Sequence, residues 1–498
     1  MNTMTTVAVA RPSADLLRTE AFLAGRWQPG ETGRTFPVTN PDNGEVIAHV
    51  ADLGAAETRR AIESAEASRE NWARGHTAKQ RAAILRRWFD LVVARREELA
   101  TILTLEQGKP YAEACGEVTF GASYIDFYAQ EATRLYGEVV PSDRPDRRIV
   151  VLTEPVGVVA AITPWNFPLA MVTRKIAPAL AAGCPVVLKP AEQTPLTALA
   201  LAVLAERAGF PPGVVNVVTG QDPEPIGREL AGHRLTRAVT FTGSTEVGKL
   251  LMAQAAATVS RVSLELGGNA PFVVFEDADL DAAVHGLIGS KFRASGQTCV
   301  CANRVFVHEA IYDAFAERLV AAVAELPVGG GFEPGVQIGP LIDDRAVTKV
   351  LAHVEQARAA GARVLTGGSK HRRGGGYVDP TVLADVDPAM TVAREETFGP
   401  VAPLLRFAGE DEVVALANDS EYGLAANVFT RDLGRAWRMG ERLEYGTVGI
   451  NTGVMSSELA PAGGMKQSGV GREGSRHGIG EFVETKYLCI EGIASANP

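Results

Sequence analysis

The chain has 498 residues, of which 46% are hydrophobic and 22% charged, and a formal net charge of −10 at pH 7. Its length exceeds one ordinary domain, and its balance of residues is that of a globular protein, which argues against a disordered or collagen-like chain. The acidic charge argues against a general nucleic-acid-binding protein, because such binding depends on neutralising phosphates. Composition therefore predicts a soluble protein of several domains and leaves its chemistry open.

The cysteines and the N-terminus bear on where the protein works. Five cysteines are too few and too scattered for a disulfide scaffold, which favours free thiols in a reducing compartment. Cys299 and Cys301 lack a second pair or spaced histidines, so no metal site is expected. Residues 1–17 lack the pattern of a secretory signal, although Arg11 and Arg18 leave an organelle-transit segment open. With no run near the about 20 apolar residues of a membrane span, we expect a cytoplasmic protein without membrane or nucleic-acid partners.

The first part of the chain predicts short strands followed by long helices. Residues 22–47 hold short runs broken by Gly and Pro, which indicate small strands and turns. Residues 55–136 show helical spacing with charged outer faces. Residues 149–163 are apolar and β-branched with a Gly and Pro break, and they predict further strands.

Strand-like apolar runs then alternate with helical patterns. A first alternation extends from Pro185 to Gly268, and a second begins at residues 271–275. Strand and helix in alternation predict parallel, doubly wound sheets with right-handed crossovers. The expected fold class is therefore α/β.

Cys299 ends the sequence Gly-Gln-Thr-Cys over residues 296–299, in a glycine-containing loop after a helix-like run. A cysteine in such a loop is a candidate exposed nucleophile, because the thiolate is the reactive form. The alternative is a small buried packing residue, which is the commoner role of a single cysteine. This loop alone does not decide between the two.

Two further polar residues stand in settings that suit catalysis. Glu265 lies in an apolar run before two glycines, where burial would raise its pKa and make it a usable general base. Asn166 is bracketed by Pro164 and Pro168, which would hold its amide in place to stabilise an oxyanion. The alternatives are a solvent-facing glutamate at a strand end and a turn asparagine bonded to its own backbone.

Two predicted strand ends suggest an anion site. Gly243, Ser244 and Gly248 follow a strand and open a helix, although the middle glycine of the usual dinucleotide fingerprint is missing. Lys189 and Glu192 lie just beyond another strand, where open α/β sheets bind ligands and where both could hold ribose hydroxyls. An ordinary turn and ordinary surface charges are the alternatives.

Taken in this order, the motifs resemble the aldehyde dehydrogenase superfamily, and the local context looks most like its succinate-semialdehyde dehydrogenase branch. The resemblance extends from about residue 22 to residue 490, and the ordered set is specific although each motif is weak alone. The motifs are PWNFP, KPAEQTP, FTGST, LELGGN, GQTC, EETFGP and GGMKQSGVGRE.

The resemblance implies two doubly wound parallel-sheet domains plus a β oligomerisation extension. The dinucleotide-binding domain would comprise residues 20–140 and 160–266, and the catalytic domain residues 267–450. The extension would comprise residues 141–159 and 482–498, which makes a homodimer or homotetramer the expected assembly.

The resemblance also implies oxidation of succinate semialdehyde to succinate. Cys299 would attack the aldehyde carbon to give a thiohemiacetal, while Asn166 and the Cys299 backbone N–H would hold the oxyanion. Hydride would pass to a nicotinamide cofactor, leaving a thioester that Glu265 would hydrolyse by activating water. The residues implied to line the cofactor are Trp165, Lys189, Pro190, Ala191, Glu192, Gly243, Ser244, Leu266, Glu396 and Phe398.

Substrate and cofactor choice follow from charge. Arg174, Arg293 and Ser457 match positions understood to hold the far carboxylate in the semialdehyde branch, and guanidinium groups suit carboxylates. The alternative for either arginine is a structural ion pair. Glu192 would repel a 2′-phosphate, so NAD is expected to be preferred over NADP, which a rotated Glu192 beside Lys189 would still tolerate.

Several alternatives stay open. Glutarate semialdehyde and other ω-carboxy aldehydes differ by methylenes worth only about 1–3 kcal/mol in an apolar pocket, and a thiol esterase using Cys299 and Glu265 is a remote alternative. Cys301 would either form a strained regulatory disulfide with Cys299 or act as a packing residue. Ala462 stands where the family usually has Phe, which would widen the substrate tunnel or reflect repacking.

Overall fold

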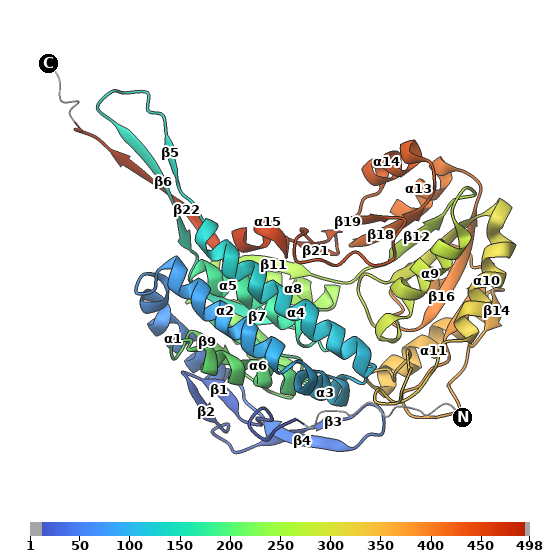
Figure 1. Ribbon diagram of the computed structural model, residues 1–498, viewed down its shortest axis with the longest axis horizontal. Helices are drawn as coiled ribbons and strands as arrows, with labels where there is room; N and C mark the ends of the chain where they lie inside the picture. Colours follow the sequence, from blue (N-terminus) through green and yellow to red (C-terminus); the bar gives the residue numbers. More distant parts are fainter. Residues whose placement is uncertain (1–11, 494–498) are drawn as a thin grey trace.

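The computed structural model describes residues 12–493. The chain forms two large sheets with helices on both faces, two small two-stranded sheets, and a three-stranded arm that projects from the first large sheet (Figure 1). These layers and their mostly parallel strands confirm the expected α/β class. Most of the N-terminal segment interpreted above (residues 1–11) and the end of the expected extension (residues 494–498) lie outside the described residues.

The first sheet has eight strands around a parallel centre. In sheet order they are β2 (Arg26–Gln28), β1 (Ala21–Leu23), β9 (Val215–Val217), β8 (Val186–Lys189), β7 (Val158–Ile162), β10 (Thr236–Thr242), β11 (Arg261–Glu265) and β21 (Gly469–Val470). Only the strands near the two edges, β1, β2 and β21, pair antiparallel. Strand β21 lies beyond the expected domain boundary at residue 450, so the chain returns to the first sheet after completing the second.

Two apolar layers cover the faces of this sheet. One layer comprises α1 (Ala55–Ala73), α7 (Pro223–Gly232) and α8 (Thr245–Ala255). The other comprises α2 (Ala78–Ala94), α3 (Arg96–Gln107), α4 (Tyr111–Glu131), α5 (Ala170–Ala182) and α6 (Pro195–Ala208). Helix α4 ends before the expected limit at residue 136, and residues 132–134 form a single 3₁₀ turn.

Local sequence explains where the helices that border the site begin. Ser244 caps α8, because its hydroxyl accepts the Val247 N–H at 3.3 Å. Pro195 is the first residue of α6, a position whose N–H makes no hydrogen bond within the helix, so proline's lack of an N–H costs nothing there. Both helices therefore start directly after strands, at the edge of the sheet where open α/β folds bind ligands.

The second sheet has seven strands. In order they are β14 (Arg363–Thr366), β15 (Thr381–Ala384), β16 (Val401–Phe407), β13 (Ala302–His308), β12 (Ala270–Val274), β18 (Ala425–Phe429) and β19 (Thr447–Ile450), with only β14 antiparallel. Its helices are α9 (Leu280–Lys291), α10 (Tyr312–Ala324), α11 (Asp344–Ala359), α12 (Thr391–Arg394), α13 (Glu410–Asn418) and α14 (Leu433–Arg442). The shorter β17 (Tyr422–Gly423) and β20 (Met465–Lys466) pair antiparallel, and α15 (Ser475–Gly480) lies between β21 and β22 along the chain.

The arm pairs β5 (Glu138–Val140), β6 (Arg148–Pro155) and β22 (Val483–Ile490) antiparallel, so two segments far apart in sequence lie side by side (Figure 1). The next strand, β7, belongs to the first sheet from Val158 onward. None of the helices within residues 12–493 combines the length and apolar character needed to cross a membrane.

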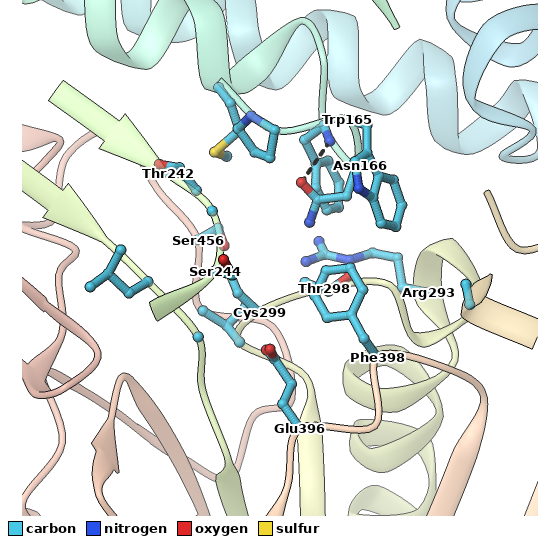
Figure 2. A pocket seen from close by; sticks show the side chains of 18 of the residues that line it. Trp165, Asn166, Thr242, Ser244, Arg293, Thr298, Cys299, Glu396, Phe398 and Ser456 are labelled. Atoms are coloured by element: carbon cyan, nitrogen blue, oxygen red, sulfur yellow. Dashed lines mark hydrogen bonds between the residues drawn. The ribbon is translucent and has the colours of Figure 1, made fainter. Parts of the chain in front are cut away.

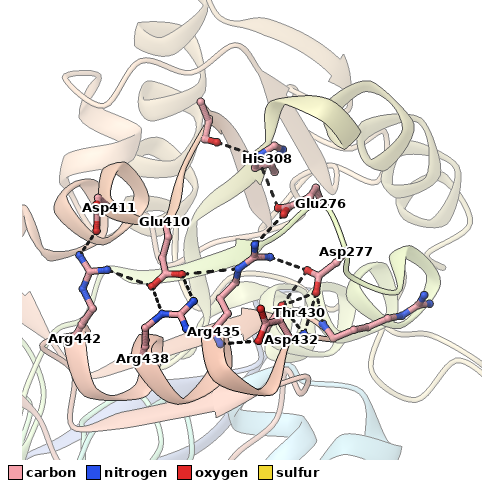
Figure 3. A network of polar contacts seen from close by, with 12 residues as sticks. Glu276, Asp277, His308, Glu410, Asp411, Thr430, Asp432, Arg435, Arg438 and Arg442 are labelled. Atoms are coloured by element: carbon pink, nitrogen blue, oxygen red, sulfur yellow. Dashed lines mark hydrogen bonds and ion pairs between the residues drawn. The ribbon is translucent and has the colours of Figure 1, made fainter.

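An ion network fixes α14 to the second sheet (Figure 3). The Arg435 guanidinium pairs with Glu276 at 2.9 Å and Asp277 at 3.0 Å, and it lies 4.4 Å from the Phe275 ring centroid. Glu410 of α13 pairs with Arg438 of α14 at 2.7 Å. These charges satisfy one another, so the network stabilises the packing of α14 without a ligand.

Candidate active site

The loop that carries Cys299 has an unusual backbone. It follows α9 and a 3₁₀ segment over Arg293–Gly296, in which Ala294 and Ser295 have φ values of 49° and 58°. Such left-handed conformations are costly for residues with side chains and persist only where surrounding contacts hold them. The Ser295 hydroxyl donates to the Gly339 carbonyl at 2.9 Å, which supplies one of those contacts.

The Gln297 side chain ties the same loop to the second sheet. Its amide nitrogen donates to the Ala294 carbonyl at 3.1 Å, and its amide oxygen accepts the Ile342 N–H at 2.9 Å. The side chain is buried, so these bonds are shielded from water. The loop therefore presents Cys299 from a fixed backbone.

Cys299 meets the end of β11 through a close backbone approach. A Cβ atom on Gly268 would lie 2.4 Å from the Cys299 carbonyl oxygen, so only glycine allows this contact. Glu265 is the last residue of β11, and its side chain lines a small cavity that Cys299 also lines. The LELGGN and GQTC motifs thus meet in space.

Glu265 is a buried carboxyl, and its Oε1 has no hydrogen-bond partner within residues 12–493. Burial and the nearby Glu473 carboxylate raise the pKa of Glu265 to about 8, against the opposing effects of Arg174 and Lys175. A carboxyl with this pKa exchanges protons near neutral pH, as a general base must.

The Cys299 thiol differs from the exposed thiolate that its sequence context suggested. The residue is half-buried, and burial with the Glu396 and Glu265 carboxylates raises the pKa of the thiol to about 12. Arg174 acts in the opposite direction but does not outweigh them. The sulfur is therefore protonated at neutral pH and needs a base to become a nucleophile.

Asn166 lies in the loop between β7 and α5, and its side chain is directed at the Cys299 loop. Its Nδ2 donates to the Gln297 carbonyl at 3.0 Å, and its Oδ1 accepts the Phe167 N–H at 3.1 Å. An amide nitrogen carries two hydrogens, so one remains for a ligand oxygen. Figure 2 shows Asn166, Arg293 and Cys299 extending toward the same space.

Two cavities share this region. The first, of about 320 Å³, is mainly apolar and is lined from both sheets, including Asn166 and Cys299. The second, of about 560 Å³, lies over the ends of β8 and β10. Trp165, Gly243 and Ser244 line both, so the two cavities are adjacent.

The second cavity contains polar atoms that have no protein partner. Four buried side-chain oxygens among its lining residues accept or donate no hydrogen bond within residues 12–493; they belong to Thr163, Gln193, Thr242 and Gln254. Buried polar groups are normally paired, so these atoms indicate a polar ligand or water. The start of α8 at Thr245 adds the N–H groups and partial positive charge that favour a phosphate. The cavity therefore fits a nucleotide.

Most of the residues expected to bind a cofactor line these cavities. Lys189, Ala191 and Glu192 line the second, whereas Leu266, Glu396 and Phe398 line the first. Pro190 is part of neither lining; its carbonyl accepts the Lys189 ammonium at 3.0 Å. Burial raises the pKa of Glu396 to about 7.

The three expected carboxylate-binding residues are placed differently. Arg293 lines the first cavity, and its buried Nε has no hydrogen-bond partner in the described chain. Arg174 also lines this cavity, but its Nε lies 2.5 Å from Glu473, so the alternative of a structural ion pair holds for it. Ser457 lines the smaller cavity with Glu265, while its neighbour Ser456 lines the first. Nothing in the sequence distinguishes the two serines.

Cys301 is buried behind the loop. Its thiol donates to the Gly296 carbonyl at 3.4 Å and lies 3.6 Å from the Lys291 ammonium. Cys299 and Cys301 are both free thiols. A disulfide between them would require the Cys301 side chain to leave these contacts.

A thiol, a buried carboxyl and a side-chain amide at the junction of two α/β sheets, beside a nucleotide-sized cavity, are features of a thiol-dependent oxidoreductase. The family model described as "Aldehyde dehydrogenase family" matches residues 27–488. The chain therefore belongs to the aldehyde dehydrogenase family and is an oxidoreductase.

Named relatives lie within this family. The chain is 55% identical to a glutarate-semialdehyde dehydrogenase of Pseudomonas aeruginosa, covering 96% of this chain and 99% of the relative. It is also 55% identical to the NADP(+) succinate-semialdehyde dehydrogenase of Escherichia coli, covering 96% and 98%. A crystal structure of succinate-semialdehyde dehydrogenase from Burkholderia pseudomallei is 58% identical, has a TM-score of 0.95, and covers 97% of this chain and 100% of that one.

Proposed function

We propose that the protein oxidises succinate semialdehyde to succinate through a covalent intermediate on Cys299. The observation that carries the substrate class is the half-buried Arg293 guanidinium, which lines the Cys299 cavity without a carboxylate partner for its Nε within residues 12–493. A second anionic group on the aldehyde would supply that partner. The names of the Escherichia coli and Burkholderia relatives support this choice.

The first step follows from the raised pKa of the Cys299 thiol. Glu265 accepts the thiol proton as the sulfur attacks the aldehyde carbon, giving a thiohemiacetal. The free N–H of the Asn166 amide and the Cys299 backbone N–H stabilise the oxyanion. Because the Asn166 amide is already held by Gln297, it needs no reorientation when this charge forms.

The second step releases the acid. A nicotinamide dinucleotide supplies, when bound, the acceptor for the hydride that leaves the carbon. Glu265 first releases the thiol proton to solvent and then accepts a proton from the water that attacks the resulting thioester. That proton passes to the Cys299 sulfur as it leaves, which restores the thiol. One carboxyl serves both steps because its pKa lies near the working pH.

The second cavity holds the cofactor in this proposal. Glu192 and Lys189 would contact a ribose, and the Ser244 turn would contact the phosphates. We propose a preference for NAD, since the Glu192 carboxylate opposes a 2′-phosphate. Lys189 lies 3.3 Å from Glu192 and partly offsets that charge, and the Escherichia coli relative is named for NADP(+).

Glutarate semialdehyde is the second candidate substrate, favoured by the name of the Pseudomonas aeruginosa relative. The deciding experiment follows cofactor reduction with aldehydes of increasing length, with and without a terminal carboxylate. We expect kcat/KM to peak at succinate semialdehyde and to be lowest without the carboxylate. No preference for the carboxylate would reject the proposal, and a maximum at the longer acid would favour glutarate semialdehyde.

We also propose that the arm joins subunits. Val139 and Tyr487 on its strands are 76% and 58% exposed, although both are large and apolar. Such residues on a projecting sheet mark a protein contact. Analytical ultracentrifugation is expected to give a homodimer or homotetramer, and a monomer at micromolar concentration would contradict this.

A further inference from the structure

Three charged residues behind the active site, two of them buried, have no place in the steps above. Lys109 precedes α4, and Glu113 and Glu117 lie one turn apart on that helix. The side chains of Lys109 and Glu117 are each only 1% exposed. Burying charges is costly unless each finds partners, so the partners indicate what these residues do.

The Lys109 ammonium holds the backbone of Asn166. Its Nζ donates to the Asn166 carbonyl at 2.7 Å and to Glu117 Oε2 at 2.5 Å. It also lies 3.9 Å from the Phe167 ring centroid, within the range of a cation–π contact. The Lys109 ammonium therefore holds the backbone of Asn166, whose side-chain amide is proposed to bind the oxyanion.

Glu117 fixes the other side of the same loop. Its Oε1 accepts the backbone N–H groups of Leu169 at 2.9 Å and Ala170 at 3.2 Å, at the start of α5. A carboxylate at this position satisfies otherwise unpaired N–H groups and complements the helix dipole. The Glu117 carboxylate thus binds both the Lys109 ammonium and the start of α5, and both of these flank Asn166.

Glu113 extends the arrangement to the Cys299 loop. Its Oε2 accepts the Ala294 N–H at 2.9 Å, and Ala294 is one of the two left-handed residues there. Residues four apart on a helix share a face, so α4 contacts both active-site loops from one side. The separation between the amide of Asn166 and the sulfur of Cys299 depends on this helix.

We infer that Lys109 is a positioning residue for Asn166, anchored by Glu117, while Glu113 positions the Cys299 loop from the same helix. This inference rests on the proposed role of Asn166. The competing explanation is simple helix capping, and the chain contains an example of it. The buried Glu106 carboxylate accepts the Leu196 N–H at 2.7 Å and the Thr197 N–H at 2.9 Å at the start of α6, which does not carry Asn166.

The test is a double-mutant cycle on the enzyme with saturating cofactor. Lys109→Met should lower kcat about 10- to 100-fold, the loss expected for a slightly misplaced catalytic group. In an Asn166→Ala background the same change should lower kcat by less than about threefold, because the group it positions is gone. A Lys109→Met effect that is equally large in both backgrounds, or absent in both, would overturn the inference.

Glu106→Gln is the matched control. It should lower thermal stability while changing kcat by the same factor with and without Asn166, since its bonds go to α6. If Lys109→Met does not fold, Lys109→Met/Glu117→Gln removes both charges and avoids a lone buried carboxylate. The double variant should show the same coupling to Asn166, and additivity there would count against the inference. If Asn166→Ala alone keeps full activity, the proposed role of Asn166 fails instead.

Discussion

The Cys299 carbonyl oxygen lies 2.4 Å from the point where a Cβ atom on Gly268 would stand. This contact joins the nucleophile loop to the strand that ends in Glu265, three residues before the glycine. Any larger residue must separate the two, because backbone atoms cannot yield as a flexible side chain can. The distance between nucleophile and base is therefore set by one glycine.

Gly268→Ala should lower kcat more than about tenfold while the protein still folds, because the loop shifts rather than unfolds. The rate at which iodoacetamide alkylates Cys299 should change with it. Gly440→Ala in α14 is the control, since nothing lies within 4 Å of its added Cβ. Wild-type kinetics in Gly268→Ala would show that the close approach is not needed.

The pKa of Glu265 predicts how the rate depends on pH. Its carboxylate is the active base, and burial with Glu473 raises its pKa to about 8, so kcat should rise with pH and level off above about 8. Folded Glu265 binds its proton more tightly than the unfolded chain does, so its contribution to stability falls as pH rises toward 8.

Glu265→Gln should remove both effects. Turnover should be lost at every pH because the protonated Cys299 thiol no longer has a base, and the melting temperature at pH 8 should rise relative to wild type. Rates between pH 6 and 9 and thermal scans at the same pH values test this. A rate that is flat across this range would exclude Glu265 as the titrating base.

Arg293→Leu should raise KM for succinate semialdehyde at least about tenfold, the loss of a charge-assisted bond, and leave KM for a neutral aldehyde nearly unchanged. The reason is that Arg293 forms no ion pair within residues 12–493, whereas the Arg174 Nε lies 2.5 Å from a Glu473 carboxylate oxygen. Arg438→Leu, in the remote ion network of Figure 3, is the control and should leave both unchanged. Equal effects of Arg293→Leu on both aldehydes would contradict the anchor.

Glu192→Gln should lower KM for NADP more than KM for NAD, because it removes a negative charge facing the 2′ position and frees Lys189. Glu224 lines the same cavity, so Glu224→Gln tests whether loss of any negative charge there lowers KM for NADP as much as loss of Glu192 does. A wild-type enzyme with a lower KM for NADP would refute the preference for NAD. Equal shifts in the two variants would show that general charge, not Glu192, sets the choice.

We propose a regulatory disulfide between Cys299 and Cys301. Its formation requires the Cys301 side chain to leave its contacts with Gly296 and Lys291. Peroxide should abolish activity, and dithiothreitol should restore it in wild type but not in Cys301→Ala, where Cys299 oxidises further. Cys184→Ala, at another buried thiol, should behave as wild type. Restoration in Cys301→Ala would assign Cys301 to packing, consistent with its bonds to Gly296 and Lys291.

The order of strands, helices and motifs was readable from sequence, because periodicity and turn residues act locally. Cys299, Glu265 and Asn166 stand in such local motifs, and the order of these motifs along the chain carries the resemblance to the family. The α/β class and the capping of α8 by Ser244 follow from the same local rules.

Tertiary structure decided what depends on distant contacts. Burial by residues far along the chain makes Cys299 a neutral thiol instead of a thiolate. Glu473 pairs with Arg174, whereas Arg293 forms no ion pair within residues 12–493, which supports Arg293 as the proposed anchor. The grip of Lys109 on Asn166 joins residues 57 positions apart. Desolvation and ion pairing depend on which segments meet in space, and no local pattern in the sequence encodes those meetings.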